Sequence, residues 1–346
     1  MANTEENWVT INGTHILLKG GESPKDAIER KFGDSRPRGS KNKSKTMQTT
    51  KKTSKTHAKI KATYEKNKSR LDAATKNYED VGVAYRAAGD EWQKLVDAAV
   101  AEDNRMFAEY PGDATWSSFD HKSPMWEKVY DAETKFGILQ KEINEAGRRK
   151  DNMRGIIRAE AKGHLFSETE TSSAKQKIGL SVSETQKPSI NIGVSRFNQL
   201  VTNTKISESE IYFVEDPGTR ARAGRNGITL GGNDDQAIVI HEMGHILEAR
   251  DPIIHERAIA FLNKRTQGET AIKMNAAMGK GFKGYDDDEI TRPSKFIDPY
   301  MGKDYGGTAT EIVSMGLQTM YERPVEFALK DPEYFDFMIE ITRGTT

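Results

Sequence analysis

The chain has 346 residues, of which 35% are hydrophobic and 30% charged, so we expect about two domains with at least one well-formed core. Its 52 Lys and Arg residues balance its 52 Asp and Glu residues, which excludes a global electrostatic attraction to nucleic acid or to an anionic membrane. There is no cysteine, so any metal must be held by histidine and carboxylate side chains rather than by thiolates.

The N-terminal region is predicted to be a small soluble unit. It lacks a basic start followed by a long apolar run, and no stretch of the chain approaches 18 apolar residues. We therefore expect neither a Sec-type signal peptide nor a membrane span. Two short runs of β-forming residues between positions 8 and 18 flank the turn dipeptide Asn12-Gly13, a pattern that predicts a β-hairpin within residues 1–34.

Residues 35–56 are predicted to be a flexible basic linker. Eight Lys and Arg residues and no acidic residue occur from Arg36 to Lys55, among Ser, Thr, Gly and Pro. The favoured interpretation is a solvated tether. The alternative is a weak contact with nucleic acid, because such a run attracts phosphates without needing a fold.

Residues 57–165 are predicted to form an α-helical hairpin with coiled-coil character. Apolar residues recur every seven positions in the first half: Tyr64, Leu71, Tyr78, Tyr85, Trp92 and Ala99. A second stripe follows a turn that contains Pro and Gly (110–124): Val129, Ala132, Phe136, Leu139, Ile143, Ala146, Met153 and Ile157. Two such helices joined by a turn most simply pack antiparallel, and we expect their core to be separate from that of the C-terminal part.

After a polar linker over residues 166–190, the pattern of residues 191–346 predicts mixed α and β structure. Residues 210–215 (EIYFVE) and 227–232 (GITLGG) have the composition of strands, with a loop between them. The second strand leads directly into a helix that we expect to begin at Asn233, with Gln236 completing a capping box. In zinc metallopeptidases a strand in this position is an edge strand that pairs with the extended substrate.

That helix carries the most informative motif of the chain, HEMGH at residues 241–245. Because a helix turns about 100° per residue, His241 and His245 project from one face and are spaced to share a metal ion. Glu242 lies to one side, where its carboxylate would reach a metal-bound water. The alternative is an amphipathic helix with two structural histidines, but that alternative gives no reason for the polar groups beside Ile238 and Ile246.

A third protein ligand is required, and several residues compete for the role. Asp251 has the spacing of the last ligand in one class of such enzymes, but Glu248 stands where that class needs a glycine to turn the chain. Glu248 itself lies one turn beyond His245, and His255 follows Pro252. We favour a carboxylate from another helix, for which residues 306–321, with Glu311, are the best candidate.

The segment DYGGTATEIVSMGLQTMYERPVEFALKDPEYFDFMI (304–339) resembles the C-terminal half of gluzincin-type zinc metallopeptidase domains, notably those of lethal-factor-like toxins. The resemblance covers roughly residues 195–346 and implies a zincin-like fold of the α+β class. It implies that Glu311 is the third zinc ligand. It also implies that Tyr305 corresponds to the tyrosine with which these enzymes stabilise the oxyanion.

Two further segments, WVTINGTHILLKGGES (8–23) and PYMGKDYGGTATEIVSMG (299–316), are similar to segments of phage head-morphogenesis and virion-associated proteins. This resemblance implies a protein that is packaged in, or assembled with, a phage-like particle, located in the cytoplasm or in the virion. The acidic run DDDE (286–289) is expected to be a solvated loop, with calcium binding or selection of basic substrates as alternatives.

The expected function is that of a zinc-dependent endopeptidase acting on protein or peptide substrates, either as a maturation protease or as a delivered toxin effector. Zn²⁺ on His241, His245 and Glu311 would activate a water molecule, and Glu242 would take its proton and pass it to the leaving amine. The alternative is a structural particle protein whose zinc site only stabilises the fold. The presence of Glu242 favours the enzyme, because a structural site has no use for a base.

Overall fold

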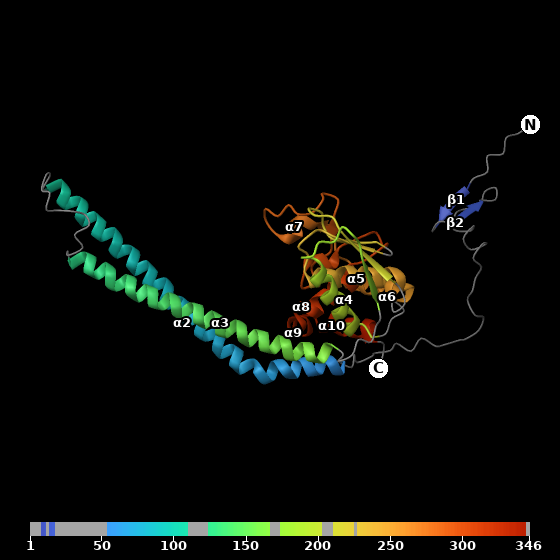
Figure 1. The fold of residues 1–346 in the computed structure, drawn as a ribbon, viewed down its shortest axis with the longest axis horizontal. Helices are drawn as coiled ribbons and strands as arrows, with labels where there is room; N and C mark the ends of the chain where they lie inside the picture. The colour runs from blue at the N-terminus through green and yellow to red at the C-terminus, as the bar shows by residue number, and fades with distance from the viewer. Residues whose placement is uncertain are drawn as a thin grey trace, which may run out of the picture. The chain divides into compact units, whose positions relative to one another are not determined.

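The computed structural model describes residues 8–11, 14–17, 54–109, 124–166, 174–202, 210–224 and 227–343. It is predominantly helical with a few short strands, which confirms the α+β class (Figure 1).

The pattern of contacts divides the chain into two units, residues 1–52 and 53–346. In the first, β1 (Trp8–Ile11) pairs antiparallel with β2 (Thr14–Leu17), which confirms the predicted hairpin. Residues 35–53 of the predicted basic linker (35–56) lie outside the described residues, and its end is corrected, because residues 55 and 56 are already helical.

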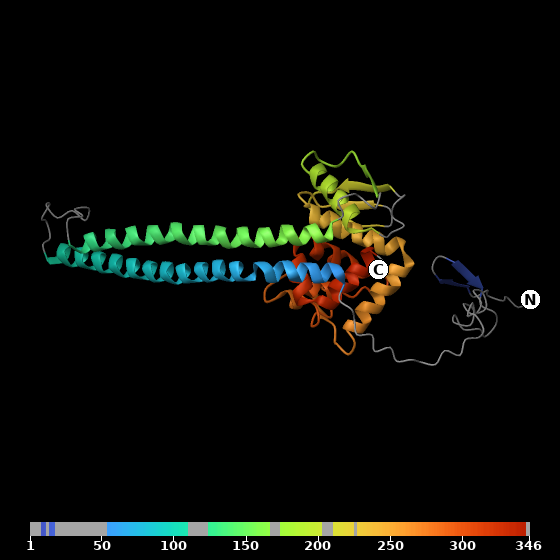
Figure 2. The same ribbon diagram turned by 90° about the horizontal axis from the view of Figure 1, so that it is seen from below.

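The second unit begins with two long helices, α2 (Lys55–Glu109) and α3 (Pro124–Leu165). They lie side by side and run antiparallel in both ribbon views (Figures 1 and 2), as the apolar stripes predict. The ring of Phe136 on α3 stacks against Tyr85 and Trp92 of α2, with centroid distances of 4.7 and 5.8 Å. The aromatic stripe is therefore the seam between the two helices.

The base of this helical hairpin is part of the main hydrophobic core. Ile60 of α2 and Leu165 of α3, both fully buried, belong to the same cluster as the core of the C-terminal helices. His57 Nδ1 also lies 3.1 Å from a carboxylate oxygen of Asp336. The expectation of separate cores is wrong at the base of the hairpin, because apolar residues at the start of α2 and the end of α3 are buried against the C-terminal helices.

A four-stranded mixed sheet precedes the motif helix. Its strands are β3 (Lys175–Ile178), β4 (Glu210–Glu215), β5 (Arg222–Ala223) and β6 (Gly227–Leu230), in the spatial order β3-β4-β6-β5. The strands β3, β4 and β6 are parallel, and β5 pairs antiparallel with β6 at the edge.

Two predictions about this sheet need correction. The segment 166–190, predicted as a linker, contains β3 and the first turn of the next helix; its polar residues suit a strand that is paired on one side only. The strand leading into the motif helix is β6, and it is internal rather than at the edge. The loop before it folds back, with Asp216 N donating to Leu230 O at 2.8 Å, and contributes the edge strand β5.

The remaining elements follow in chain order. They are α4 (Lys187–Leu200), α5 (Gln236–Arg250), α6 (Pro252–Arg265), β7 (Ile272–Lys273), α7 (Met274–Met278), β8 (Ile290–Thr291), the 3₁₀ helix η2 (Pro299–Gly302), α8 (Ile312–Glu322), α9 (Pro324–Lys330) and α10 (Pro332–Arg343). The short strands β7 and β8 pair antiparallel.

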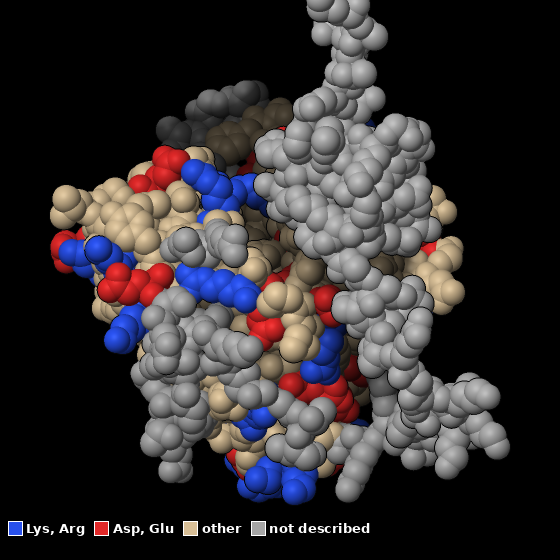
Figure 3. Space-filling view, turned by 90° about the vertical axis from the view of Figure 1, so that its right-hand side faces the viewer, with Lys and Arg blue, Asp and Glu red and all other residues tan. Residues whose placement is uncertain are grey.

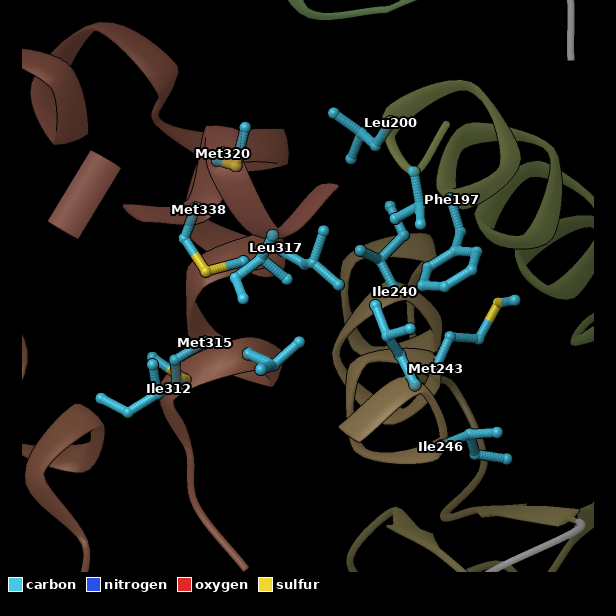
Figure 4. Close-up of a cluster of buried hydrophobic side chains, with 14 of the residues drawn as sticks. Phe197, Leu200, Ile240, Met243, Ile246, Ile312, Met315, Leu317, Met320 and Met338 are labelled. Atoms are coloured by element: carbon cyan, nitrogen blue, oxygen red, sulfur yellow. The ribbon is translucent and has the colours of Figure 1, made fainter. Parts of the chain in front are cut away.

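Helix α5 lies in the centre of the core, with α4 on one side and α8 on the other (Figure 4). Phe197 of α4 packs toward Ile240 and Met243 of α5, while Leu317 of α8 approaches from the opposite side. Gly244 allows α5 and α8 to approach closely, since a Cβ added there would lie 2.6 Å from Ser314 Cα. This contact brings α8, with its N-terminal residue Glu311, against the motif helix.

The start of α5 differs from the predicted capping box. Its N-cap is Asp235, whose side chain accepts hydrogen bonds from Ala237 N at 2.8 Å and Ile238 N at 3.1 Å. Asn233 lies before the helix with φ of 62°, a left-handed conformation that asparagine tolerates better than most residues. The predicted cap at Asn233 is therefore wrong, because a carboxylate two positions later binds the first amides.

Among the described residues, no helix is long and apolar enough to cross a membrane. On the face shown in Figure 3, acidic and basic side chains are interspersed over the coloured surface, with no large area of a single sign. This distribution matches the equal numbers of acidic and basic residues in the chain.

Candidate metal centre

Three side chains meet between α5 and the start of α8. His241 and His245 come from successive turns of α5, and Glu311 is the residue immediately before α8. The two Nε2 atoms are 3.2 Å apart, and Glu311 Oε2 lies 3.3 Å from His241 Nε2 and 3.2 Å from His245 Nε2. Within the described part of the chain, these residues form a group that could hold a metal ion.

The spacing of these three atoms is that of a tetrahedral metal site. Ligands placed about 2.0 Å from an ion at the corners of a tetrahedron lie about 3.3 Å from one another. The three observed distances, between 3.2 and 3.3 Å, agree with this value. Three protein ligands leave the fourth corner of the tetrahedron to a non-protein group.

Burial makes positively charged or hydrogen-bonding neighbours favourable for the Glu311 carboxylate. Glu311 is fully buried, and burial by itself would raise the pKa of its carboxyl group. Hydrogen bonds with His241 and His245 outweigh that effect and hold the pKa of Glu311 well below its ordinary value of 4.5. A buried carboxylate held in its charged form by two imidazoles is the donor set of a metal site.

Neighbouring residues orient two of the three ligands, His241 and Glu311. His241 Nδ1 lies 3.0 Å from Gln318 Oε1, an atom that only accepts hydrogen bonds, so Nδ1 carries a hydrogen and Nε2 is the ring nitrogen that would bind a metal in place of its proton. Ser314 Oγ donates to Glu311 Oε2 at 2.8 Å, and the Tyr305 hydroxyl donates to Glu311 Oε1 at 2.5 Å.

Glu242 lies beside the ligands but is not one of them. Its side chain is 4% exposed, and its Oε2 atom has no hydrogen-bond partner among the described residues. Burial raises the pKa of the Glu242 carboxyl group, although the neighbouring histidines act in the opposite direction. Glu242 lines the same hollow as His241, as its position next to His241 in the sequence leads one to expect.

The competing third ligands are engaged elsewhere. The side chain of Asp251 accepts from Ile253 N and Ile254 N and so caps α6. Glu248 is buried, with Oε2 accepting from Thr310 Oγ1 at 2.7 Å and Oε1 lying 3.1 Å from His255 Nδ1. Glu248 and His255 therefore flank the centre, and Thr310 fixes the chain next to Glu311.

Two residues near the centre were not found by sequence reasoning. The ring of Tyr300 lies 6.2 Å from that of His241, and its hydroxyl accepts from Arg220 at 3.2 Å. Tyr300 belongs to η2, and the irregular chain around it carries no periodic signal. Gln318 follows Glu311 by seven residues, two helical turns on the same face, so that helix position could have identified it.

Two open hollows border the centre. The first, of about 500 Å³, is lined by His245, Tyr305 and small residues such as Ala223 and Ala249. The second, of about 480 Å³, is lined by His241, Glu242 and Tyr300, among others. Open space therefore lies on both sides of the ligands.

No protein-family model, no curated protein and no solved structure matches this chain.

Proposed function

We propose that this protein is a zinc-dependent endopeptidase of the gluzincin type, with His241, His245 and Glu311 as zinc ligands and Glu242 as the general base. Two imidazoles and one carboxylate are a donor set typical of catalytic zinc. When bound, zinc supplies a Lewis acid that lowers the pKa of a water molecule in the open position. The resemblance of residues 304–339 to lethal-factor-like toxins supports the same assignment.

The observation that carries the proposal is the state of Glu242. A metal site that only stabilises the fold needs no further carboxylate, yet Glu242 is buried beside the ligands with an unpartnered oxygen. Leaving such a group without a partner costs about 1–3 kcal/mol. A role as general base accounts for this cost. In that role Glu242 takes a proton from the attacking water and later delivers it to the leaving amine.

Two phenols complete the proposed site. Burial raises the pKa of Tyr305 and of Tyr300 above the ordinary value for tyrosine, so each keeps its proton at neutral pH and can donate a hydrogen bond. In the proposal Tyr305, which now donates to Glu311 Oε1, turns to the developing oxyanion, as the resemblance implies. Tyr300 is the neighbouring donor.

The substrate is proposed to be an extended peptide that lies along the free edge of β5. An edge strand offers unpaired backbone groups to which a peptide can add as a further strand. Association with a phage-like particle is part of the proposal, supported by the resemblance of residues 8–23 and 299–316.

The test combines metal analysis with a cleavage assay on the full chain. We expect about one zinc per chain, lost in His241→Ala and Glu311→Ala. Asp251→Asn is the matched control. Asparagine also caps helices well, so this variant should keep its zinc. Glu242→Gln should keep zinc but lose cleavage of a peptide library by at least about a hundredfold. A zinc-loaded wild type that cleaves no peptide would favour the structural alternative.

A further inference from the structure

The hollow beside His241 and Glu242 has walls that suit a long side chain. The rings of Tyr285 and Tyr300 stack with centroids 5.6 Å apart, and both rings line the hollow together with Met278 and Met315. With a volume of about 480 Å³, it accommodates a large amino-acid side chain. Aromatic and thioether surfaces pack well against a chain of methylene groups.

The charges that line this hollow are mainly negative. Its carboxylates are those of Asp234, Asp298 and Glu242. Asp234 Oδ2 accepts only from a backbone amide, that of Gly231, at 2.6 Å. Asp298 Oδ1 accepts from Tyr300 N at 2.9 Å, and Asp298 Oδ2 forms a long ion pair with Arg323 Nη2 at 4.0 Å. Backbone amides leave the negative charge of both groups in place.

The one arginine that lines the hollow, Arg220, already has partners. Its guanidinium nitrogens lie 3.3 Å from Glu289 Oε2 and 3.2 Å from the Tyr300 hydroxyl. The guanidinium also lies over the Tyr285 ring, 4.8 Å from its centroid. Arg220 thus pairs with Glu289, a carboxylate that it shares with Lys303, and its position shows that the aromatic wall accepts a cation on its face.

One buried carboxylate in the wall of this hollow has an oxygen that receives no hydrogen bond. Glu242 Oε2 has no hydrogen-bond partner within the described ranges, and its residue is 4% exposed. A cationic or hydrogen-bond-donating ligand in the hollow would complement this wall, whereas a carboxylate would be repelled by all three acids.

We propose that this hollow is a specificity pocket that accepts the lysine or arginine side chain of a peptide residue adjacent to the scissile bond. The inference rests on the proposed endopeptidase function and names its substrate class. The methylene stem lies against the two tyrosines and the methionines, and the cation approaches Asp234 and Asp298.

The acidic run 286–289 does not perform this selection. Glu289 is bound by Lys303 and Arg220, and Asp287 Oδ1 pairs with Lys273 Nζ at 3.1 Å. Its charges are exposed or already balanced, so the selecting carboxylates are those of the hollow itself.

The test compares arginine with citrulline, its neutral isostere. Full-length zinc-loaded wild type is given a peptide library, and the cut sites are sequenced; lysine or arginine should be enriched at one position adjacent to the cut. Zinc-loaded Glu242→Gln is then titrated with a labelled peptide that carries arginine or citrulline at that position. If the library yields no cut site, arginine or citrulline is placed in the middle of the peptide instead. Arginine should bind at least about tenfold tighter, a difference of about 1.4 kcal/mol.

Substitutions localise the effect. Asp298→Asn and Asp234→Asn keep the oxygen that accepts the backbone amide, so each should fold and should lower the ratio of arginine to citrulline affinity severalfold. Asp288→Asn is the matched control, because it removes an exposed charge from the acidic run, and it should leave the ratio unchanged.

The outcomes separate this inference from the endopeptidase proposal. Cleavage without enrichment of lysine or arginine next to the cut, or with a preference for acidic residues there, contradicts the specificity pocket and supports the endopeptidase. Equal affinity for the two peptides also overturns the pocket. Tighter binding of arginine without any cleavage by wild type supports a cation-selective pocket and contradicts the endopeptidase.

Discussion

Gln318 determines which nitrogen of His241 is available to a metal. Its amide oxygen lies 3.0 Å from His241 Nδ1, and this hydrogen bond fixes both the tautomer and the orientation of the ring. Such partners of metal-binding histidines typically change metal affinity by about 10–100-fold when removed. Gln318 therefore belongs to the centre, because it orients a ligand although it would not contact the metal itself.

We predict that Gln318→Leu weakens zinc binding by about 10–100-fold, because leucine fills a similar volume but accepts no hydrogen bond. Gln318→Glu restores the acceptor and should recover most of the affinity. Competition with a chelator of known affinity measures both. Equal zinc affinity in wild type and Gln318→Leu would show that the ring needs no partner.

At the residue scale, sequence reasoning succeeded where spacing within one helix carries the geometry. His241 and His245 are one turn apart, so their shared face follows from helix geometry alone. Glu311 lies far along the chain, and only the resemblance implied its role, because no local pattern reports which distant residue meets a helix. Tyr300 had neither kind of signal.

At the scale of elements, the contact between α5 and α8 sets the position of the ligands. Gly244 lies on α5 between the two histidines, where a Cβ would meet Ser314 Cα at 2.6 Å and Ser314 N at 3.0 Å. Both neighbours are backbone atoms, so neither can move without moving α8. Any increase in this separation displaces Glu311 from His241 and His245.

We therefore predict that Gly244→Ala destabilises the protein by about 1–3 kcal/mol, as expected for overpacking, and weakens zinc binding. The control is Gly155→Ala on α3, where a Cβ has no atom within 4 Å and alanine should stabilise the helix by about 0.5–1 kcal/mol. Urea unfolding and zinc titration measure both variants. A Gly244→Ala protein as stable as wild type would contradict this account of the contact.

The loop that leads to Glu311 is held by an ion pair. Arg292 donates to Asp304 Oδ2 at 2.5 Å, and Gly306 N donates to Asp304 Oδ1 at 2.9 Å. The hydrogen bond from Arg292 is the largest cause that lowers the pKa of Asp304 below its ordinary value of 3.8. Because the folded-state pKa is depressed, this pair stabilises the fold above the ordinary pKa and ceases to do so as the pH falls through the lowered value.

We predict that wild type is more stable than Asp304→Asn at about pH 6 and that this difference shrinks as the pH falls to about 3 and below. Urea unfolding of the metal-free proteins measures it, since without zinc the pH-dependent release of metal cannot contribute to the difference. A difference that is constant over this range would mean that Asp304 contributes through its hydrogen bonds alone and not through its charge.

Elements with a long, regular pattern were predictable, and very short ones were not. The heptad stripe of α2 and α3 extends over many turns, so single exceptions do not hide it. The strand β5 has two residues, Arg222 and Ala223, and two residues carry no periodicity. Its pairing depends on the fold-back of the preceding loop, which is a tertiary contact. The edge strand of the sheet was therefore beyond sequence reasoning.

At the scale of the whole second unit, the helical hairpin and the metal-binding part are joined through one core. Leu165 ends α3 fully buried in the main cluster, and Arg343 of α10 donates to the backbone oxygen of Leu165. His57 and Asp336 add a buried polar contact between α2 and α10. Unfolding the base of the hairpin therefore exposes part of the core that supports α5 and α8.

We predict that Leu165→Ala lowers the free energy of unfolding by about 2–5 kcal/mol, as large-to-small core substitutions do, and that zinc release shifts to lower urea together with the loss of helix. Ile138→Ala, at a position on α3 that is 53% exposed, is the control and should change stability by no more than about 0.5 kcal/mol. Circular dichroism and a zinc indicator follow the two events in one titration. With separate cores, Leu165→Ala would shift the helical signal and leave zinc release where it is in wild type; with the shared core, both midpoints move by the same amount.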